Sequence, residues 1–396
     1  MPAMRPYPLL FEPLYKPKLW GGDSIFTHFA HPRPVTVPIG ESWELADLEN
    51  DQSCVRNGPA AGRTLGELRE TWSRELLGPA PLFEGRFPLL IKFLDAHAWL
   101  SLQVHPSEAV ARRLGGNVRV KHEAWYVLAA EPGGAIYHGL EPGVTAAAFR
   151  EAMLTGRVDG ILRKVPVHPG ECYYLPSGTP HALGKGVLVA EIQTPSHITY
   201  RTYDWGRVDP ATGQPRELHL DAAIECIDFD APSPPAIQAL PPSRDKSRTH
   251  LVACEWFTID RVTLSESVRE SMQSRDRQRA EPASTGISTR KDRFLTGAAP
   301  LEPTASPTRP NGAPQQPEHS AIQDQAGASP TANPCSSEMC VWIWLDGKAE
   351  ILRTSGERVL SLTKGDVVLW PAAATDARVH PSPDAVWLEV GVPARH

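Results

Sequence analysis

The feature that most constrains the fold of this chain is a long succession of short apolar and aromatic runs, punctuated by glycine and proline. Such runs fill residues 8–50 and continue through IKFLDAHAWLSLQVHP, EAWYVLAAEPGGAIYHGL and PGECYYLPSGTPHAL. Short apolar runs bounded by turn residues are typical of β-strands. The sequence lacks both the regular strand–helix alternation of parallel α/β proteins and the glycine motifs that bind phosphates or dinucleotides. We therefore predict a mainly β protein of jelly-roll type.

A few segments depart from this strand pattern. Residues 63–78 carry leucines and a tryptophan at helical spacing and end in glycine, which predicts a helix. The stretch VTAAAFREAMLTG predicts a second helix, with Thr145 as its N-cap. We interpret both as insertions into the first β domain. The glycine- and tryptophan-rich stretches at 20–22 and 40–43 are expected to be packing sites.

Length and charge limit the class of protein. A chain of 396 residues can bury a large core and form two domains. Its 40 Lys and Arg residues against 46 Asp and Glu residues give a net charge of −6, which argues against a nucleic-acid surface. The N-terminal stretch MPAMRPYPLLFEPLYKPKLWGG contains no apolar run long enough for a signal peptide or a membrane span. We expect a cytoplasmic protein that binds neither membranes nor nucleic acids.

Composition divides the chain further toward its C-terminus. A proline-rich joint at 231–248 follows the first domain, 1–230, and precedes a second domain, 249–396. Within the second domain, residues 267–338 are rich in Pro, Ser, Ala, Thr, Gln and Arg, and Phe294 is their only aromatic residue. Such a segment cannot bury enough apolar surface to offset its ordering entropy. We predict that it is a disordered insertion in a hairpin loop.

A spacing of glycine, proline and a polar residue occurs once in each domain. The two sets are Gly170, Pro176 and His181, and Gly365, Pro371 and Asp376. In the first set the glycine turns the chain and the proline ends a strand just before the histidine. This spacing matches the second motif of the cupin barrel. We therefore predict two cupin barrels, with helical insertions in the first, and no metal in the second because Asp376 stands alone at the histidine position.

Residues that suit a metal ion occur in the first domain. Gln103 and His105 lie two positions apart in a strand-like run, so their side chains point to the same face. Glu123 precedes another aromatic strand, and His181 follows the turn described above. Two imidazoles, a carboxylate and an amide oxygen suit a divalent ion, most simply zinc. A lone histidine near a strand end is usually a surface or core residue, so the barrel-motif spacing of His181 is what favours this hypothesis.

The chain resembles the type I mannose-6-phosphate isomerases in their shorter bacterial form. The matching segments run through most of residues 8–230: LWGG, GESWELAD, LLIKFLDAHAWLSLQVHP, KHEAWYVL, LPSGTPHAL, AEIQTPSHITYRTYDWGR and PRELH. The Gln-x-His-Pro stretch, the Lys-x-Glu step and the Tyr-Arg pair, in this order, are specific. The resemblance implies one zinc ion per chain, bound by Gln103, His105, Glu123 and His181.

The same resemblance implies a set of residues that face the substrate. They are Lys92 and Ser101 as binding residues, and Lys121, Glu191 and Arg201 as catalytic residues. Lysine and serine side chains have the right chemistry for a phosphate. Without the resemblance, Lys92 would be interpreted as a strand-edge residue that reaches solvent, Glu191 as half of a salt bridge, and Arg201 as a brace for the turn at Asp204.

The implied reaction interconverts D-mannose 6-phosphate and D-fructose 6-phosphate by moving a proton between C2 and C1 through an enediolate. A divalent cation and the guanidinium of Arg201 would stabilise the charge that develops on the substrate oxygens. Glu191 and Lys121 are the ionisable candidates for the proton transfer, and His122 is a weaker one. The sequence does not choose among them.

Two functions of other classes compete with this prediction. A cupin dioxygenase would use non-haem iron and would normally need more histidine ligands, so Gln103 argues against it. A non-catalytic sugar-binding cupin would be expected to have lost part of its metal site, whereas the ligand set here is intact. We expect a phosphorylated hexose as the substrate, and a monomer or a weak dimer in solution.

Overall fold

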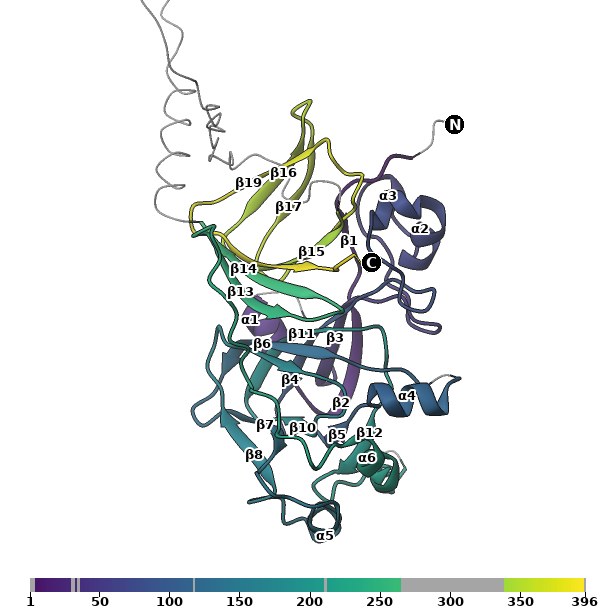
Figure 1. Ribbon diagram of the computed structural model, residues 1–396. Coiled ribbons are helices and arrows are strands. Elements are labelled where there is room, and N and C mark those ends of the chain that lie inside the picture. Colours follow the sequence, from purple (N-terminus) through teal and green to yellow (C-terminus); the bar gives the residue numbers. More distant parts are fainter. Residues whose placement is uncertain are drawn as a thin grey trace, which may run out of the picture.

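The computed structural model describes residues 4–29, 33, 36–116, 118–209, 212–264 and 338–394. Its strands form four antiparallel sheets stacked as layers along the long axis of the molecule (Figure 1). The predicted mainly β class is thus confirmed. The segment 267–338, predicted to be disordered, lies outside the described residues except for Glu338.

Two of the layers face each other in the half that carries the candidate site. The central sheet has the order β2 (Leu14–Gly22), β3 (Ile39–Leu45), β4 (Leu90–Ala96), β11 (Val187–Gln193), β6 (Glu123–Ala130) and β9 (Cys172–Leu175). The basal sheet has the order β12 (Tyr200–Tyr203), β5 (Leu102–Val104), β10 (His181–Leu183), β7 (Ala135–Leu140) and β8 (Leu162–Pro166).

The other two layers belong mainly to the C-terminal part. The distal sheet has the order β1 (Leu9–Leu10), β18 (Val367–Trp370), β15 (Cys340–Asp346), β20 (Val386–Gly391), β14 (Thr258–Thr263) and β13 (Arg248–Ala253). The cap sheet has the order β17 (Arg358–Leu362), β16 (Ala349–Arg353) and β19 (Ala377–Pro381). Because β1 pairs with β18, the N-terminus supplies a strand to the sheet that the C-terminus builds.

The central sheet is buried on both faces, which explains why its strands are almost continuously apolar. On β11, Val187 and Val189 join the core beneath the sheet, while Leu188, Ala190 and Ile192 join the core shared with the distal sheet. Side chains alternate between the two faces of a strand. A polar residue at a basal-facing position is therefore held between the central and basal sheets.

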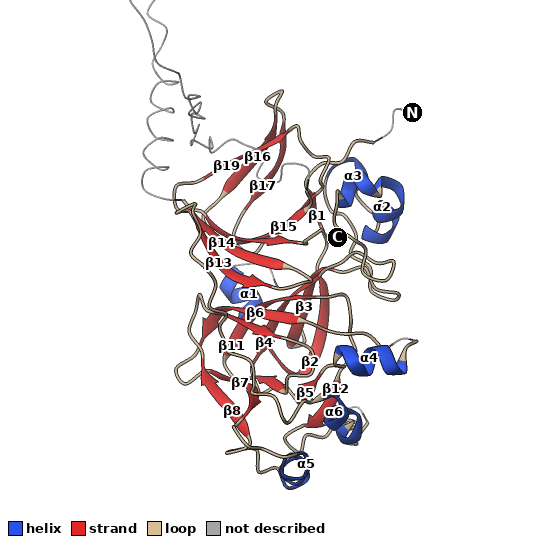
Figure 2. Cartoon of the chain, in the orientation of Figure 1, coloured by secondary structure: helices blue, strands red, loops and turns tan. Residues whose placement is uncertain are grey.

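Most helices lie outside the sheets, whereas α1 (Ser24–Phe29) packs into the core shared by the central and distal sheets (Figure 2). The others are η1 (Gly58–Ala60), α2 (Leu65–Trp72), α3 (Arg74–Leu77), α4 (Glu108–Leu114), α5 (Ala146–Thr155) and α6 (Leu220–Cys226). Thr145 caps α5 as predicted, since its side chain accepts a hydrogen bond from the Ala148 amide. The helix predicted at 63–78 is broken in two at Ser73, whose φ is +42°. No helix of the described part is long and apolar enough to cross a membrane.

The segment between β14 and β15 does not form the hairpin loop that we predicted. Both strands pair with β20, one on each side, and both run antiparallel to it. The two strands are therefore parallel to each other, and the residues between them connect opposite ends of the sheet. The sequence could not reveal this because β20 comes almost at the end of the chain.

Candidate active site

Strand alternation brings the predicted metal ligands to one place between the central and basal sheets. On β6, Trp125 and Val127 belong to the core between the two sheets, so Glu123 points into it as well. From the basal sheet, His181 on β10 pairs in register with Gln103 on β5. The turn that precedes β10 thus places His181 directly beside the Gln103–His105 pair.

Three of the predicted ligands form a compact buried cluster. Donor atoms of His105, Glu123 and His181 all lie within 4.8 Å of one another. The Oε1 atom of Glu123 is 2.9 Å from His181 Nε2 and 3.4 Å from His105 Nε2. Gln103 reaches the same point, since its Nε2 donates to His181 Nε2 at 3.1 Å. Rotating that amide by half a turn would present its oxygen instead.

Hydrogen bonds on the far side of each imidazole orient both histidines. Nδ1 of His105 lies 2.9 Å from the carbonyl oxygen of Ile198, and Nδ1 of His181 lies 2.8 Å from that of Thr179. A carbonyl oxygen accepts a hydrogen bond from Nδ1–H, so in the neutral ring Nε2 is unprotonated and free to bind a metal ion. Burial, with a further contribution from Lys121, lowers the pKa of His105 to about 3, so this imidazole stays neutral.

The carboxylate of Glu123 also fits a cation. It is fully buried, and its Oε2 forms an ion pair with Lys121 Nζ. Burial alone would raise its pKa, but the positive charge of Lys121, with smaller contributions from the two histidines, holds that pKa well below its usual range. A buried, ionised carboxylate beside two oriented imidazoles is a donor set suited to a divalent ion.

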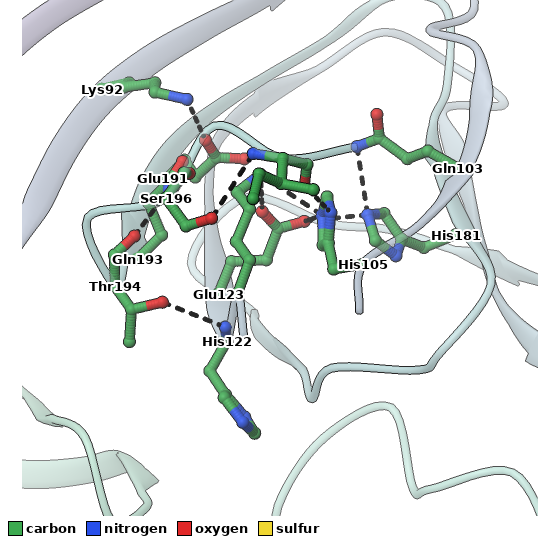
Figure 3. A network of polar contacts seen from close by, with 12 residues as sticks. Lys92, Gln103, His105, His122, Glu123, His181, Glu191, Gln193, Thr194 and Ser196 are labelled. Atoms are coloured by element: carbon green, nitrogen blue, oxygen red, sulfur yellow. Dashed lines mark hydrogen bonds and ion pairs between the residues drawn. The ribbon is translucent and has the colours of Figure 1, made fainter. Parts of the chain in front are cut away.

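A cavity of about 300 Å³ opens beside this cluster. Its lining includes all five residues predicted to face the substrate together with one predicted ligand: Lys92, Ser101, Lys121, Glu191, Arg201 and Gln103. Figure 3 shows Lys92 and Glu191 on one side of the cluster and Gln103 on the other, next to His181. Lys121 joins the cavity to the cluster because its Nζ is 2.5 Å from Glu123 and 3.3 Å from His105 Nε2.

Two of the cavity residues form a buried ion pair. Lys92 Nζ lies 3.0 Å from Glu191, which also accepts a hydrogen bond from the indole of Trp125 at 2.9 Å. Lys92 is only 6% exposed, so it is not the solvent-reaching edge residue that its apolar neighbours suggested. Glu191 does form a salt bridge, as the simpler interpretation held, but it forms this bridge on the cavity wall.

Several cavity residues were not anticipated. Glu41 lies 4.0 Å from Lys92 and 3.0 Å from Lys18, and it accepts a hydrogen bond from the Trp43 indole at 2.6 Å. All four line the cavity, as does Trp20, so the stretches at 20–22 and 40–43 do more than pack. The available signal was the two-residue spacing of Glu41 and Trp43, which places both on one face of β3.

The guanidinium of Arg201 lines the cavity but does not brace the neighbouring turn. Its Nη1 donates to the Glu217 carbonyl at 2.9 Å. Asp204 instead accepts hydrogen bonds from Arg207 and Arg216, so the alternative role proposed for Arg201 is wrong. Burial, with the nearby charge of Arg216, lowers the pKa of Arg201 from its very high ordinary value.

His122 points away from the site. Its ring projects to the opposite side of the strand from Glu123 (Figure 3), as neighbouring residues do in extended chain. Its Nδ1 is 2.8 Å from the hydroxyl of Tyr174, and its ring stacks on Trp256 at 5.6 Å. His122 does not line the cavity, which removes it as a candidate for the proton transfer.

A buried His–Glu–His cluster beside a charged cavity, in a layered mainly β fold, defines a candidate metal-dependent enzyme acting on a small polar substrate. Residues 9–131 match the family model of the type I phosphomannose isomerase catalytic domain. The chain is 40% identical over 263 residues to mannose-6-phosphate isomerase ManA of Bacillus subtilis, covering 66% of this chain and 80% of that one. The mannose-6-phosphate isomerase of Streptococcus mutans is 37% identical over 264 residues, with the same coverage.

The solved structures agree in fold. The mannose 6-phosphate isomerase of Bacillus subtilis superposes with a TM-score of 0.69, covering 98% of this chain and all of that one at 24% identity. The chain belongs to the type I mannose-6-phosphate isomerase family, as its motifs predicted.

Proposed function

We propose that this protein is an aldose–ketose isomerase that interconverts D-mannose 6-phosphate and D-fructose 6-phosphate. The observation that carries the proposal is the cavity, where all five expected substrate-facing residues adjoin the buried metal cluster. The chain also covers 80% of a relative named mannose-6-phosphate isomerase at 40% identity. A phosphorylated sugar would meet several cationic side chains and a serine hydroxyl in this cavity.

The residues that would hold the metal ion are Gln103, His105, Glu123 and His181. Two neutral imidazoles with two oxygen donors form a set that zinc accepts, and we propose one Zn²⁺ per chain. When bound, the ion would supply positive charge next to the substrate oxygens at C1 and C2. The hydrogen bonds from the two imidazoles to Ile198 and Thr179 would orient this set.

The remaining chemistry is assigned to side chains of the cavity. Burial disfavours a charged Lys121, but the carboxylates of Glu123 and Glu191 outweigh this and raise its pKa, so Lys121 keeps its proton. We infer that Glu191 accepts the proton from the substrate carbon, while Lys121 donates a hydrogen bond to the developing enediolate. Arg201 would stabilise the same negative charge. Lys92 would bind the substrate and hold Glu191 in place at 3.0 Å, and Ser101 would donate a hydrogen bond to the substrate from its hydroxyl.

At the level of the fold, we propose that the chain comprises two cupin barrels, residues 1–230 and 249–396, joined by 231–248. In the second barrel Asp376 pairs with Arg353 at 2.7 Å and is part-exposed, which supports a metal-free role for that domain. The cytoplasmic location and the monomer or weak dimer state stay predictions.

The decisive experiment measures isomerisation of mannose 6-phosphate in a coupled assay, with metal content determined on the same preparation. We expect turnover that is lost on chelation and restored by zinc, and no turnover of unphosphorylated mannose. A zinc-loaded, folded protein without turnover would refute the proposal. Bound iron together with oxygen consumption would instead point to a dioxygenase.

A further inference from the structure

The segment 121–123, which leads into β6, carries two residues of the site. Glu123 belongs to the metal cluster, Lys121 contacts it through Glu123 and His105, and His122 between them points away (Figure 3). The strand ladder begins at Glu123, which pairs with Leu175 and Gln193, so Lys121 and His122 lie outside it. Contacts outside the strand ladder must therefore hold Lys121 and His122 in place.

Two hydroxyl residues supply part of that support. The Lys121 amide donates to the Ser177 hydroxyl at 2.9 Å. The Thr194 amide donates to the His122 carbonyl at 3.0 Å, and the His122 amide donates to the Thr194 hydroxyl at 3.3 Å. These contacts hold the backbone on either side of His122, and the contacts of the His122 side chain add to them.

Aromatic rings hold that side chain. His122 is 7% exposed and stacks on Tyr174, with ring centroids 6.2 Å apart and planes 15° apart, and on Trp256, at 5.6 Å and 27°. The hydroxyl of Tyr174 adds a hydrogen bond to Nδ1 at 2.8 Å. The imidazole therefore has little freedom to turn.

Trp256 reaches His122 from another layer of the molecule, at the turn between β13 and β14 of the distal sheet. The turn is held by a hydrogen bond from the Cys254 amide to the Phe257 carbonyl at 3.1 Å, and by one from the Phe257 amide to Cys254 Sγ at 3.4 Å. Phe257 is fully buried and meets the edge of Tyr174. The distal sheet thus presents a well-anchored indole to the back of the strand that carries Glu123.

We propose that Trp256 is a positioning residue for the metal centre, acting through His122 on Lys121 and Glu123. The inference rests on the metal site proposed above. Removing the indole would take away a ring on which His122 stacks and so loosen the support of this segment, which carries two side chains that now meet at 2.5 Å. Displacements of about 1 Å in an active site can cost up to about a hundredfold in rate. The C-terminal domain then contributes to the chemistry without touching the substrate.

The test compares Trp256→Ala with Trp256→Phe, which keeps a stacking ring, and with Leu360→Ala as a control. Leu360 is buried between the distal and cap sheets, so its loss destabilises the C-terminal domain away from His122. The measurements are the zinc dissociation constant by chelator competition, kcat and KM at saturating zinc, and the melting temperature. Tyr174→Phe, which removes only the hydroxyl bonded to His122, is the second probe should Trp256→Ala fail to fold.

We expect Trp256→Ala to weaken zinc binding and lower kcat by about tenfold each, with KM changed by less than about threefold. Trp256→Phe should recover most of both losses, and Leu360→Ala should lower the melting temperature with zinc affinity unchanged. A folded Trp256→Ala variant with wild-type zinc affinity and kcat overturns the inference. If the alanine variant is insoluble, a Tyr174→Phe variant with wild-type zinc affinity and kcat overturns it as well. Absence of zinc binding by the wild-type chain overturns the metal site itself and this inference with it.

Discussion

Glu44 makes the stability of this protein depend on pH in a way that can be calculated. It lies on β3 next to Trp43, facing away from the cavity; it is 8% exposed and accepts a hydrogen bond from the Ser42 hydroxyl. Burial raises its pKa from 4.5 to about 7, and Ser42 and Arg56 only partly oppose this shift. At 1.36 kcal/mol per pH unit, ionising Glu44 in the folded state costs about 3 kcal/mol.

The direction of the effect follows from proton uptake. The folded protein holds the Glu44 proton up to about pH 7, whereas the unfolded chain releases it near pH 4.5. The contribution to the free energy of unfolding is therefore fully present below pH 4.5 and is lost as the pH rises through about 7. Glu44→Gln keeps the shape of the side chain and its acceptor for Ser42, and it cannot ionise.

We expect the Glu44→Gln variant to be more stable than wild type by about 3 kcal/mol at pH 8 and nearly equal to it at pH 4.5. Urea unfolding at both pH values, followed by tryptophan fluorescence, measures this difference. Glu70→Gln is a suitable control because its side chain is 74% exposed. If the free energies of unfolding of Glu44→Gln and wild type differed by the same amount at both pH values, the reasoning would be refuted. Turnover should be unchanged, since Glu44 does not line the cavity.

Three further outcomes test the site and the domain organisation. His105→Ala and His181→Ala delete nitrogen donors and should abolish both zinc binding and turnover. Gln103→Ala removes a weak neutral donor and should keep part of the zinc occupancy. Full zinc occupancy and wild-type turnover in His181→Ala would exclude the proposed metal centre. Arg201→Ala should keep its zinc and its melting temperature, because Asp204 is held by Arg207 and Arg216 instead. Its kcat should fall by about a hundredfold through loss of a charge that stabilises the transition state. Loss of zinc in this variant would instead show that Arg201 has a structural role. Replacing 267–338 with a Gly-Ser linker of about 12 residues, long enough to run the length of β20 at about 3.3 Å per residue, should preserve fold and kcat. Insoluble protein or a large fall in kcat would show that the segment packs or gates.

The local pattern of the sequence determined which residues face the site. Residues two apart on a strand share a face whatever the strand pairs with, so the spacing of Gln103 and His105 is enough to place them together. The same alternation turns His122 away from Glu123. The glycine–proline–histidine spacing likewise depends on a turn and a strand end, which are short-range features.

Only the tertiary structure decided which distant segments meet. Lys92 pairs with Glu191, 99 residues away, because β4 and β11 are neighbours in one register. β1 joins the distal sheet, and Trp256 reaches His122 from a different layer. Strand register and sheet stacking depend on how whole faces pack and on the closure of long loops, which a local pattern does not encode. The burial that gives Glu44 its raised pKa arises in the same way, from layers that are built by opposite ends of the chain.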